Sequence, residues 1–331
     1  MLSGLNISKV QDNCLRAVWI FLFALSPAVS FAQKKEIPLD TSYTINATFK
    51  KLIKKHPDIE IANPTFPVHI NKKENIVYHK IGDRQLHADV FYPKEQSAQA
   101  YPAVIMVHGG GWRSGNKSLN ATMAAQIAAK GYVVVAVEYR LSLEAKYPAA
   151  VYDIKAAVRW LRENAGNYHA DKNKVAVMGF SAGAQLATLV GTTNNVTRFE
   201  GPKKKSKTSS AVQAIVNVDG TLAFRHPESV EGTVAAFWLG GTYDEVPEIW
   251  QEAAPLSHAG ENTPPILFIN SDVPRFHAGR DDMINKIKPF HIYSEVHTLA
   301  NSPHSFWLFH PWFKPTVDYA VTFLDNVFGR K

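Results

Sequence analysis

The chain has 331 residues, 46% of them hydrophobic and 20% charged, and its formal net charge is +7. This composition is that of an ordinary globular protein, not of a disordered chain, and it supplies enough apolar residues for one large core. Much of the positive excess lies in one run, Lys203–Lys207, which is typical of a solvated loop; loose attraction to acidic polymers is the functional alternative. No nucleic-acid-binding motif accompanies the run, so we expect no nucleic-acid partner.

The first 32 residues have the pattern of a secretory signal. Basic residues precede an apolar run, 17–29, and small residues follow that fit cleavage after Ala32. The run is interrupted by Pro27 and is shorter than the roughly 20 residues that a membrane-spanning helix needs. We therefore expect residues 1–32 to be a signal peptide, the mature protein to have no membrane span, and its location to be secreted or periplasmic.

Two further segments complete the domain organisation. Residues 33–70 are polar, rich in lysine and interrupted by prolines, which predicts an N-terminal leader packed loosely on the body of the protein. Residues 71–331 form one predicted α/β domain. The single cysteine, Cys14, would leave with the signal, so the mature protein would contain neither a disulfide nor thiol chemistry.

From residue 71 onward, strand and helix patterns alternate. Short apolar or alternating runs predict strands at Ile76–Ile81, His87–Tyr92, Ala103–Val107, Tyr132–Val137, Lys174–Met178, Val212–Val218, Pro265–Asn270 and His291–Thr298. Helical patterns occupy Asn120–Lys130, Ala149–Asn164, Ala182–Val190, Asp281–Lys288 and Pro315–Phe328. The alternation predicts an α/β fold with a mostly parallel central sheet and helices on both faces. Ligands of such sheets bind at the carboxyl ends of the strands, and residues 199–261 are expected to form a small partial cap there.

A G-x-S-x-G sequence, Gly179–Gly183, stands between a predicted strand and a predicted helix. This context predicts a sharp turn that raises the hydroxyl of Ser181 above the sheet as a nucleophile, with glycines where side chains would collide. The N–H groups of the following helix would face the developing negative charge. A plain glycine-rich turn is the alternative interpretation.

A second glycine-rich loop, His108–Trp112, follows the predicted strand 103–107. Its backbone can pass close to a substrate, and the N–H groups of Gly110 or Gly111, with that of Ala182, are candidate donors to an oxyanion. A phosphate-binding loop would need a Lys-Ser/Thr pair after the glycines, and none follows. We interpret His108 itself as a structural brace of the loop.

The candidate base and acid come late in the chain. His304 follows the last predicted strand, where it could take the proton of Ser181 and return it to a leaving group. Asp272 follows the strand 265–270, and the chain order serine, aspartate, histidine is the one expected of this arrangement. Asp281, at the start of the next predicted helix, is the alternative acid. Its negative charge could instead serve only to complement the dipole at the helix N-terminus.

Together these motifs resemble the acetylesterase and feruloyl-esterase-like (BD-FAE-like) carbohydrate esterases of the α/β-hydrolase superfamily. The resemblance rests on the HGGGW loop at 108–112, the GxSAG turn at 179–183 and the His-Ser-Phe sequence at 304–306, and it covers about residues 76–328. It implies an α/β-hydrolase fold, a serine carboxylesterase with a Ser-His-Asp acyl-enzyme mechanism, and no cofactor. The interval from Asp272 to His304 matches the interval between the acid and the histidine that is common in this family. The segment 276–282 departs from the family's aspartate-proline-valine-proline run, which keeps Asp281 open as the acid.

The resemblance, taken with the expected export, predicts an acylated carbohydrate as the substrate. The expected reaction is removal of small acyl groups, acetyl above all, from a plant-type polysaccharide or oligosaccharide such as xylan or pectin. Trp112 and Trp307 could stack on sugar rings or could simply fill the core. Arg275 could bind a carboxylate, such as a uronate, or pair with nearby acidic residues.

Two other classes of function stay open beside the esterase. A peptidase of the same fold is one alternative, and a non-catalytic binding module of the hydrolase fold is the other. The binding module would usually lack the nucleophile or the base, whereas Ser181 and His304 are both present. We expect no metal, because the sequence contains neither an H-E-x-x-H motif nor clustered ligands.

Overall fold

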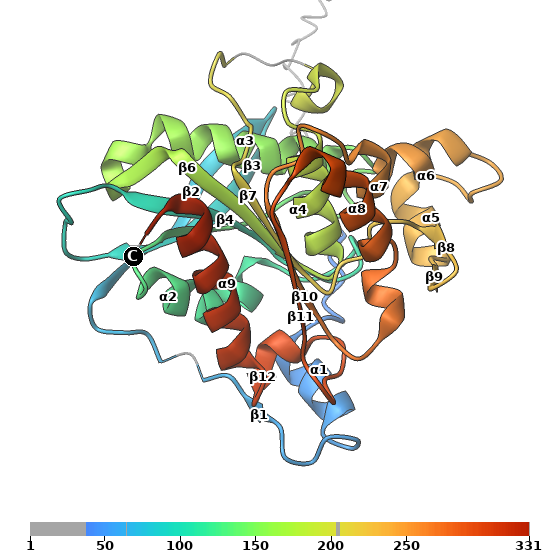
Figure 1. Ribbon diagram of the computed structural model, residues 1–331, viewed down its shortest axis with the longest axis horizontal. Helices are drawn as coiled ribbons and strands as arrows, with labels where there is room; N and C mark the ends of the chain where they lie inside the picture. Colours follow the sequence, from blue (N-terminus) through green and yellow to red (C-terminus); the bar gives the residue numbers. More distant parts are fainter. Residues whose placement is uncertain (1–37, 64, 203–205, 331) are drawn as a thin grey trace, which may run out of the picture. The chain divides into compact units, whose positions relative to one another are not determined.

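The computed structural model describes residues 38–63, 65–202 and 206–330, so the expected signal peptide lies outside the described residues. Within them, an eight-stranded sheet with the order β11-β10-β7-β6-β4-β5-β3-β2 forms the centre of the fold (Figure 1). Its strands are β2 (Ile70–Ile81), β3 (Arg84–Pro93), β4 (Tyr101–Val107), β5 (Val133–Val137), β6 (Ala170–Phe180), β7 (Ala214–Val218), β10 (Ile266–Asn270) and β11 (Ser294–Thr298). From β5 to β11 all neighbours are parallel, and β3 runs antiparallel to both β2 and β5. The prediction of a mostly parallel α/β sheet is confirmed.

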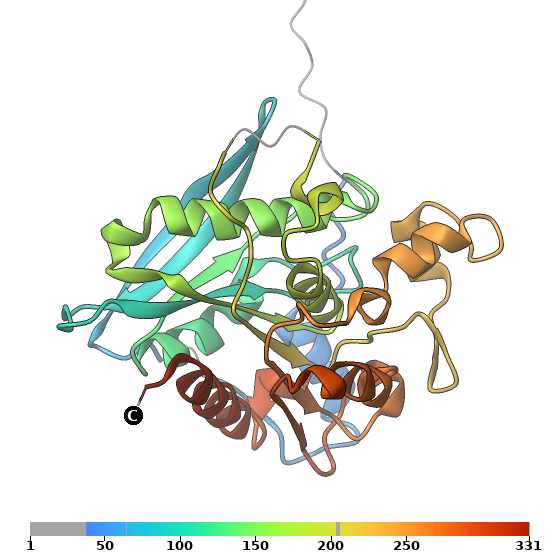
Figure 2. The ribbon, with the colours of Figure 1, turned by 45° about the horizontal axis from the view of Figure 1, so that its top comes forward.

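Helices cover both faces of this sheet, as the burial of β4 illustrates. Every residue from Ala103 to Val107 is fully buried, and the side chains alternate between two core clusters. Helices α3 (Ala149–Glu163) and α4 (Ala182–Thr192) pack in the first cluster, and α2 (Ala121–Ala128) and α9 (Phe313–Phe328) pack in the second. Figure 2 shows α3 on one side of the sheet and α9 on the other. A strand buried on both faces needs a continuous apolar run, which explains the sequence AVIMV.

The chain between β7 and β10 forms a small additional region, whereas the expected cap, residues 199–261, also included β7, which belongs to the central sheet. It contains the hairpin of β8 (Arg225–His226) and β9 (Ser229–Val230) and the helices α5 (Thr233–Leu239), α6 (Pro247–Ala253) and α7 (Pro255–His258). These helices extend from one side of the sheet (Figure 2). Two buried tryptophans, Trp238 and Trp250, attach the region to the first core cluster.

The described part of the leader, residues 38–63 and 65–70, is more ordered than the expectation of loose packing. Helix α1 (Ile45–Leu52) places its partly buried apolar side chains against the second core cluster. Strand β1 (Glu60–Ile61) pairs antiparallel with β12 (Phe309–His310). The reason is the spacing of Ile45, Phe49 and Leu52, which puts three apolar side chains on one face of a helix.

The strand boundaries also differ from prediction in an informative way. Strand β6 ends at Phe180, which extends the predicted strand up to the residue before Ser181. Strand β11 begins at Ser294, three residues later than predicted, because His291 has a left-handed φ of 56° that ends a preceding 3₁₀ turn. The candidate site residues follow the carboxyl ends of parallel strands, and these ends meet at one edge of the sheet.

Candidate active site

Ser181 occupies the turn between β6 and α4. Its φ is 53° and its ψ is −123°, a sparsely populated conformation for a residue with a side chain. The turn forms because Gly179 and Gly183 lack side chains: a Cβ on Gly179 would lie 2.0 Å from the carbonyl oxygen of Gly183, and a Cβ on Gly183 would lie 2.4 Å from that of His108. The turn is held by the N–H of Ser181, which donates to the carbonyl of Val218 at 2.9 Å.

His304 lies in the loop after β11 and faces Ser181. The distance from the Ser181 Oγ to the His304 Nε2 is 2.8 Å. The ring of Phe276 stacks on the imidazole with 3.4 Å between centroids, and Trp307 contacts it edge-on from another side. The side chain of His304 is 23% exposed, so a substrate can reach it while its neighbours fix the plane of the ring.

The acid that orients His304 is Asp219, which follows β7. Its Oδ2 accepts a hydrogen bond from the His304 Nδ1 at 2.6 Å. The carboxylate is fully buried and also accepts bonds from the N–H of Ser271 at 2.9 Å and from the Ser271 hydroxyl at 2.7 Å. A carboxylate can only accept, so Nδ1 carries the proton and Nε2 is free to accept the proton of Ser181.

This geometry corrects the predicted acid. Asp272 is exposed, and its carboxylate accepts a bond from the backbone N–H of Asn301 instead of from His304. Asp281 is also exposed and pairs with Arg280 at 2.8 Å. The strand β10 does end beside the site, but the residue that it turns toward the site is Ser271, and Asp272 comes one residue later. The signal available in the sequence was an aspartate at the end of the preceding predicted strand, 212–218.

The predicted oxyanion loop lies against the Ser181 turn. A Cβ on Gly109 would lie 2.7 Å from the carbonyl oxygen of Phe180, and a Cβ on Gly110 would lie 2.1 Å from that of Ser114. Gly110 and Gly111 both have positive φ, and both line the same cavity as Ser181. Ala182 begins α4, where the N–H groups have no acceptor within the helix. The residues of all three predicted donors therefore line a cavity that Ser181 also lines.

His108 acts as the brace that the sequence suggested. It is buried, its Nδ1 donates to the carbonyl of Gly109 at 2.8 Å, and its ring stacks on Tyr139 with 4.4 Å between centroids. The Tyr139 hydroxyl donates to the His108 carbonyl at 2.9 Å. Burial lowers the pKa of His108 to about 4, so the ring is neutral near pH 7.

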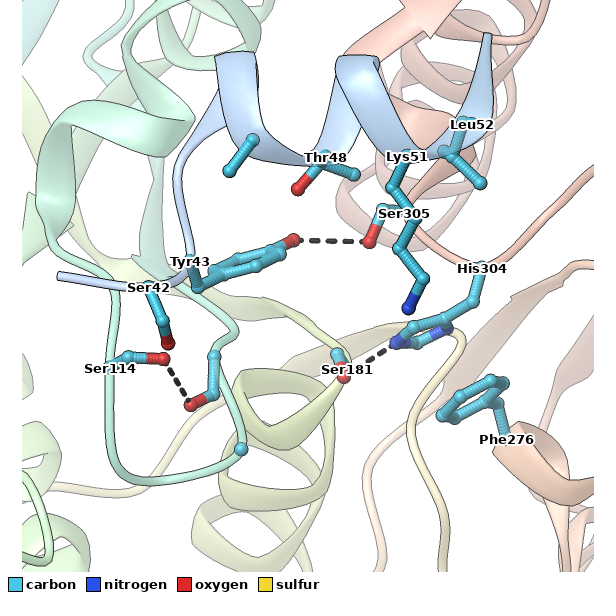
Figure 3. A pocket seen from close by; sticks show the side chains of 13 residues that line it. Ser42, Tyr43, Thr48, Lys51, Leu52, Ser114, Ser181, Phe276, His304 and Ser305 are labelled. Atoms are coloured by element: carbon cyan, nitrogen blue, oxygen red, sulfur yellow. Dashed lines mark hydrogen bonds between the residues drawn. The ribbon is translucent and has the colours of Figure 1, made fainter. Parts of the chain in front are cut away.

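Two cavities meet at Ser181. The larger one, the leader-side cavity, has a volume of about 500 Å³ and is lined by Ser42, Tyr43, Ala47, Thr48, Lys51, Leu52, Gly110, Gly111, Ser114, Ser181, Phe276, His304 and Ser305 (Figure 3). The smaller one, the hairpin-side cavity, has a volume of about 310 Å³ and is lined by Gly111, Trp112, Ser181, Ala182, Asp219, Thr221, Glu231, Gly232, Thr233, Val234, Arg275 and Phe276. His304 lines only the leader-side cavity.

The three predicted substrate-binding residues have different positions. Trp112 lines the hairpin-side cavity, yet it is 4% exposed, stacks on Trp238 and donates from Nε1 to Gln185 at 2.9 Å. Trp307 lines neither cavity and is buried against Phe180, which corrects its prediction as a sugar-binding residue. Its indole instead supports His304. Arg275 does line the hairpin-side cavity, where it lies 3.5 Å from Glu231.

Two other features are absent from the part of the chain that the structure describes. No group of three or more histidine, cysteine, aspartate or glutamate side chains there could hold a metal ion. None of the described helices is long and apolar enough to cross a membrane.

A mostly parallel sheet that presents a serine on a strained turn, a histidine and a buried aspartate at one edge defines an α/β-hydrolase fold with a serine–histidine–aspartate site. The sequence profile of the BD-FAE family matches residues 88–282, which is more than half of the chain. The chain belongs to the BD-FAE family.

Curated relatives and solved structures agree with this assignment. Esterase LipC of Mycobacterium tuberculosis is 29% identical over 202 residues, which are 59% of this chain and 48% of LipC. An arylesterase of Saccharolobus solfataricus is 34% identical over 108 residues, or 32% of this chain and 35% of that protein. The chain spans about half the length, or less, of these relatives.

Among solved structures, a truncated carbohydrate esterase from gut microbiota superposes with a TM-score of 0.66 at 25% identity, covering 79% of this chain and 98% of that one. Esterase 2 of Thermogutta terrifontis with bound butyrate superposes with a TM-score of 0.65 at 22% identity, covering 78% and 95%. This second likeness establishes the shared fold alone.

Proposed function

We propose that this protein is a serine carboxylesterase that removes small acyl groups, acetyl above all, from plant-type polysaccharides or oligosaccharides such as xylan or pectin. The observation that carries the proposal is the hydrogen-bonded chain from Ser181 through His304 to Asp219, next to a glycine loop. The name of the gut-microbiota carbohydrate esterase supports the carbohydrate part of the substrate.

The acylation step follows from the contacts. The Ser181 oxygen attacks the ester carbonyl carbon while the His304 Nε2 takes the hydroxyl proton. The carbonyl oxygen becomes an oxyanion that accepts bonds from Ala182 and from the glycine loop; one such donor is typically worth about 10²–10³ in rate. The buried Asp219 carboxylate stabilises the imidazolium that forms.

The positions of the two cavities support an assignment of the two halves of the substrate. When the tetrahedral intermediate collapses, His304 returns its proton to the leaving alcohol oxygen, so the alcohol must lie on the side of His304. That side is the leader-side cavity, whose lining hydroxyls from Ser42, Tyr43, Thr48 and Ser305 suit a sugar. The acyl group then extends into the hairpin-side cavity, and water later hydrolyses the acyl-enzyme by the same route.

Acetate release from acetylated xylan and acetylated pectin tests the proposal, with Ser181→Ala as the inactive control. Release above that control supports the proposal, and a series of 4-nitrophenyl esters of increasing chain length defines the acyl limit. Activity confined to long-chain lipids would remove the carbohydrate part. Cleavage of peptides without cleavage of esters would favour a peptidase, and failure of a fluorophosphonate to label Ser181 would favour a binding module.

Export is part of the same proposal. The sequence pattern of residues 1–32 supports a signal peptide, and a polysaccharide too large to enter a cell would require an exported enzyme. Expression of the full chain followed by N-terminal sequencing of the exported product tests it. A mature N-terminus at Gln33 is expected, and retention of the intact chain inside the cell would contradict it.

A further inference from the structure

The leader contributes a wall of the site because it is attached to the body on both sides of α1. Before the helix, Asp40 pairs with Arg113 at 2.8 Å. The Tyr43 hydroxyl lies 3.2 Å from the Ser305 Oγ, next to His304 (Figure 3). After the helix, the β1–β12 pairing continues with the N–H of Ala62, which donates to the carbonyl of Leu308 at 2.9 Å. These attachments make α1 a fixed part of the leader-side cavity.

Lys51 is the one cationic side chain that α1 places in this cavity. Figure 3 shows it extending from the helix toward His304, with its amino nitrogen on the side of Ser181. The other lysine of the described helix, Lys50, does not line the cavity. The ammonium of Lys51 therefore lies where the alcohol part of an ester would bind.

The described lining of the leader-side cavity contains no aspartate or glutamate. Asp40, the acidic residue that precedes α1, is engaged by Arg113. The hairpin-side cavity differs, because its arginine, Arg275, already faces Glu231 within the cavity. An ammonium beside a forming imidazolium is unfavourable unless an anion compensates it. Asp219 compensates the imidazolium through Nδ1. The described lining of the leader-side cavity supplies no carboxylate for Lys51, and the substrate can.

We propose that Lys51 is a specificity-determining residue that donates hydrogen bonds to a carboxylate on the alcohol part of the substrate. The preferred substrates are then acylated saccharides that contain a uronic acid. The proposal rests on the ester hydrolysis proposed above and narrows its substrate class. Charge-assisted hydrogen bonds of this kind are directional and stronger than neutral ones, and because the site is open to solvent the preference weakens as salt is added.

The test uses one saccharide in two charge states. Acetylated galacturonic-acid oligosaccharides are compared with the same preparation after methyl esterification of the carboxyl groups, and acetate release gives kcat/KM for each. We expect the wild type to prefer the free acid about tenfold, mainly through KM. Lys51→Gln should lower this ratio toward one, and Lys51→Arg should retain most of it. Lys50→Gln, which removes the same charge from the same helix, should retain the wild-type ratio.

Equal activity of the wild type on both forms, or an unchanged ratio in Lys51→Gln, overturns the proposal. Binding of unacetylated oligogalacturonide to the Ser181→Ala variant gives a readout that needs no turnover, and Lys51→Gln should weaken it about tenfold. Hydrolysis of 4-nitrophenyl acetate separates the two proposals: an active enzyme that ignores the carboxylate loses only the Lys51 inference. An enzyme inactive on every ester that still binds the acidic saccharide through Lys51 loses the esterase function instead.

Discussion

Replacement of Asp219 by asparagine is a sharp test of the site, because the surrounding bonds dictate how the amide must lie. In the native protein one carboxylate oxygen accepts from the backbone N–H of Ser271, and the other accepts from the Ser271 hydroxyl and from His304. A backbone N–H can only donate, so the amide oxygen of the asparagine must take the first position. The amide NH₂ group then faces the Nδ1 of His304.

The consequence is that the imidazole of His304 adopts the other tautomer. Nδ1 must accept from the new NH₂ group, so the proton of the neutral ring moves to Nε2, the atom that lies 2.8 Å from the Ser181 oxygen. Such a ring cannot take the Ser181 proton, and the anion that stabilised the imidazolium is gone as well. The same change in a serine protease lowers kcat by about 10⁴. We expect a loss of about 10³–10⁴ here, equivalent to about 4–5.5 kcal/mol in the activation free energy.

The assay is steady-state hydrolysis of 4-nitrophenyl acetate, with Ser181→Ala as the baseline. Asp272→Asn is the matched control, because it makes the same chemical change one strand along the sheet, at an exposed carboxylate bound to Asn301. Its kcat should stay within about threefold of the wild type. An Asp219→Asn variant with more than a tenth of wild-type kcat, or an equal loss in Asp272→Asn, would refute the assignment of the acid.

Three further predictions concern the frame of the site. Gly183→Ala puts a Cβ 2.4 Å from the carbonyl oxygen of His108, so thermal unfolding should show a loss of about 3 kcal/mol; Gly166→Ala, where a Cβ meets nothing within 4 Å, should show none. Burial lowers the pKa of His108 from 6.5 to about 4, so the unfolded chain takes up the proton first as pH falls. The contribution of neutral His108 to the free energy of unfolding, about 3 kcal/mol, is therefore fully present above pH 6.5 and is lost as the pH falls toward 4. In urea titrations over this range, the free energy of unfolding should fall less in His108→Asn than in the wild type. Trp112→Phe leaves the buried Oε1 of Gln185 without its indole donor, which should cost about 1–3 kcal/mol in the same titrations.

The parts of the site that are continuous in sequence could be predicted from it. The turn at Ser181 and the loop 108–112 both follow short apolar runs. Four of their glycines stand where the structure leaves no room for a Cβ: Gly109, Gly110, Gly179 and Gly183. The burial pattern of β4 and the end of β6 likewise follow from local sequence. Local patterns are enough in these cases because the strain and the close contacts lie within a few residues of each glycine, or between two adjacent strands.

The acid could not be chosen in this way, because the choice depends on the directions of side chains from two neighbouring strands. β7 and β10 are adjacent and parallel, and an aspartate follows each of them within two residues. Asp219 follows β7 immediately and is fully buried, whereas Asp272 comes one residue after Ser271, which takes the inward position. The order serine, aspartate, histidine holds for both candidates, so chain order could not separate them.

The leader shows a different limit of prediction from sequence, and this limit concerns the substrate specificity. The spacing of Ile45, Phe49 and Leu52 suits one face of a helix, but the polar composition of the leader led to the expectation of loose packing, and only the tertiary contacts place α1 beside His304. The match to the BD-FAE family covers residues 88–282, which include Ser181 and Asp219 but neither α1 nor His304. Ser181, Asp219 and the glycine loop thus lie in the region that defines the family, and the wall that we propose to contact the alcohol lies outside it. Relatives matched over the shared region can therefore share the ester chemistry and still differ in the saccharide that they accept.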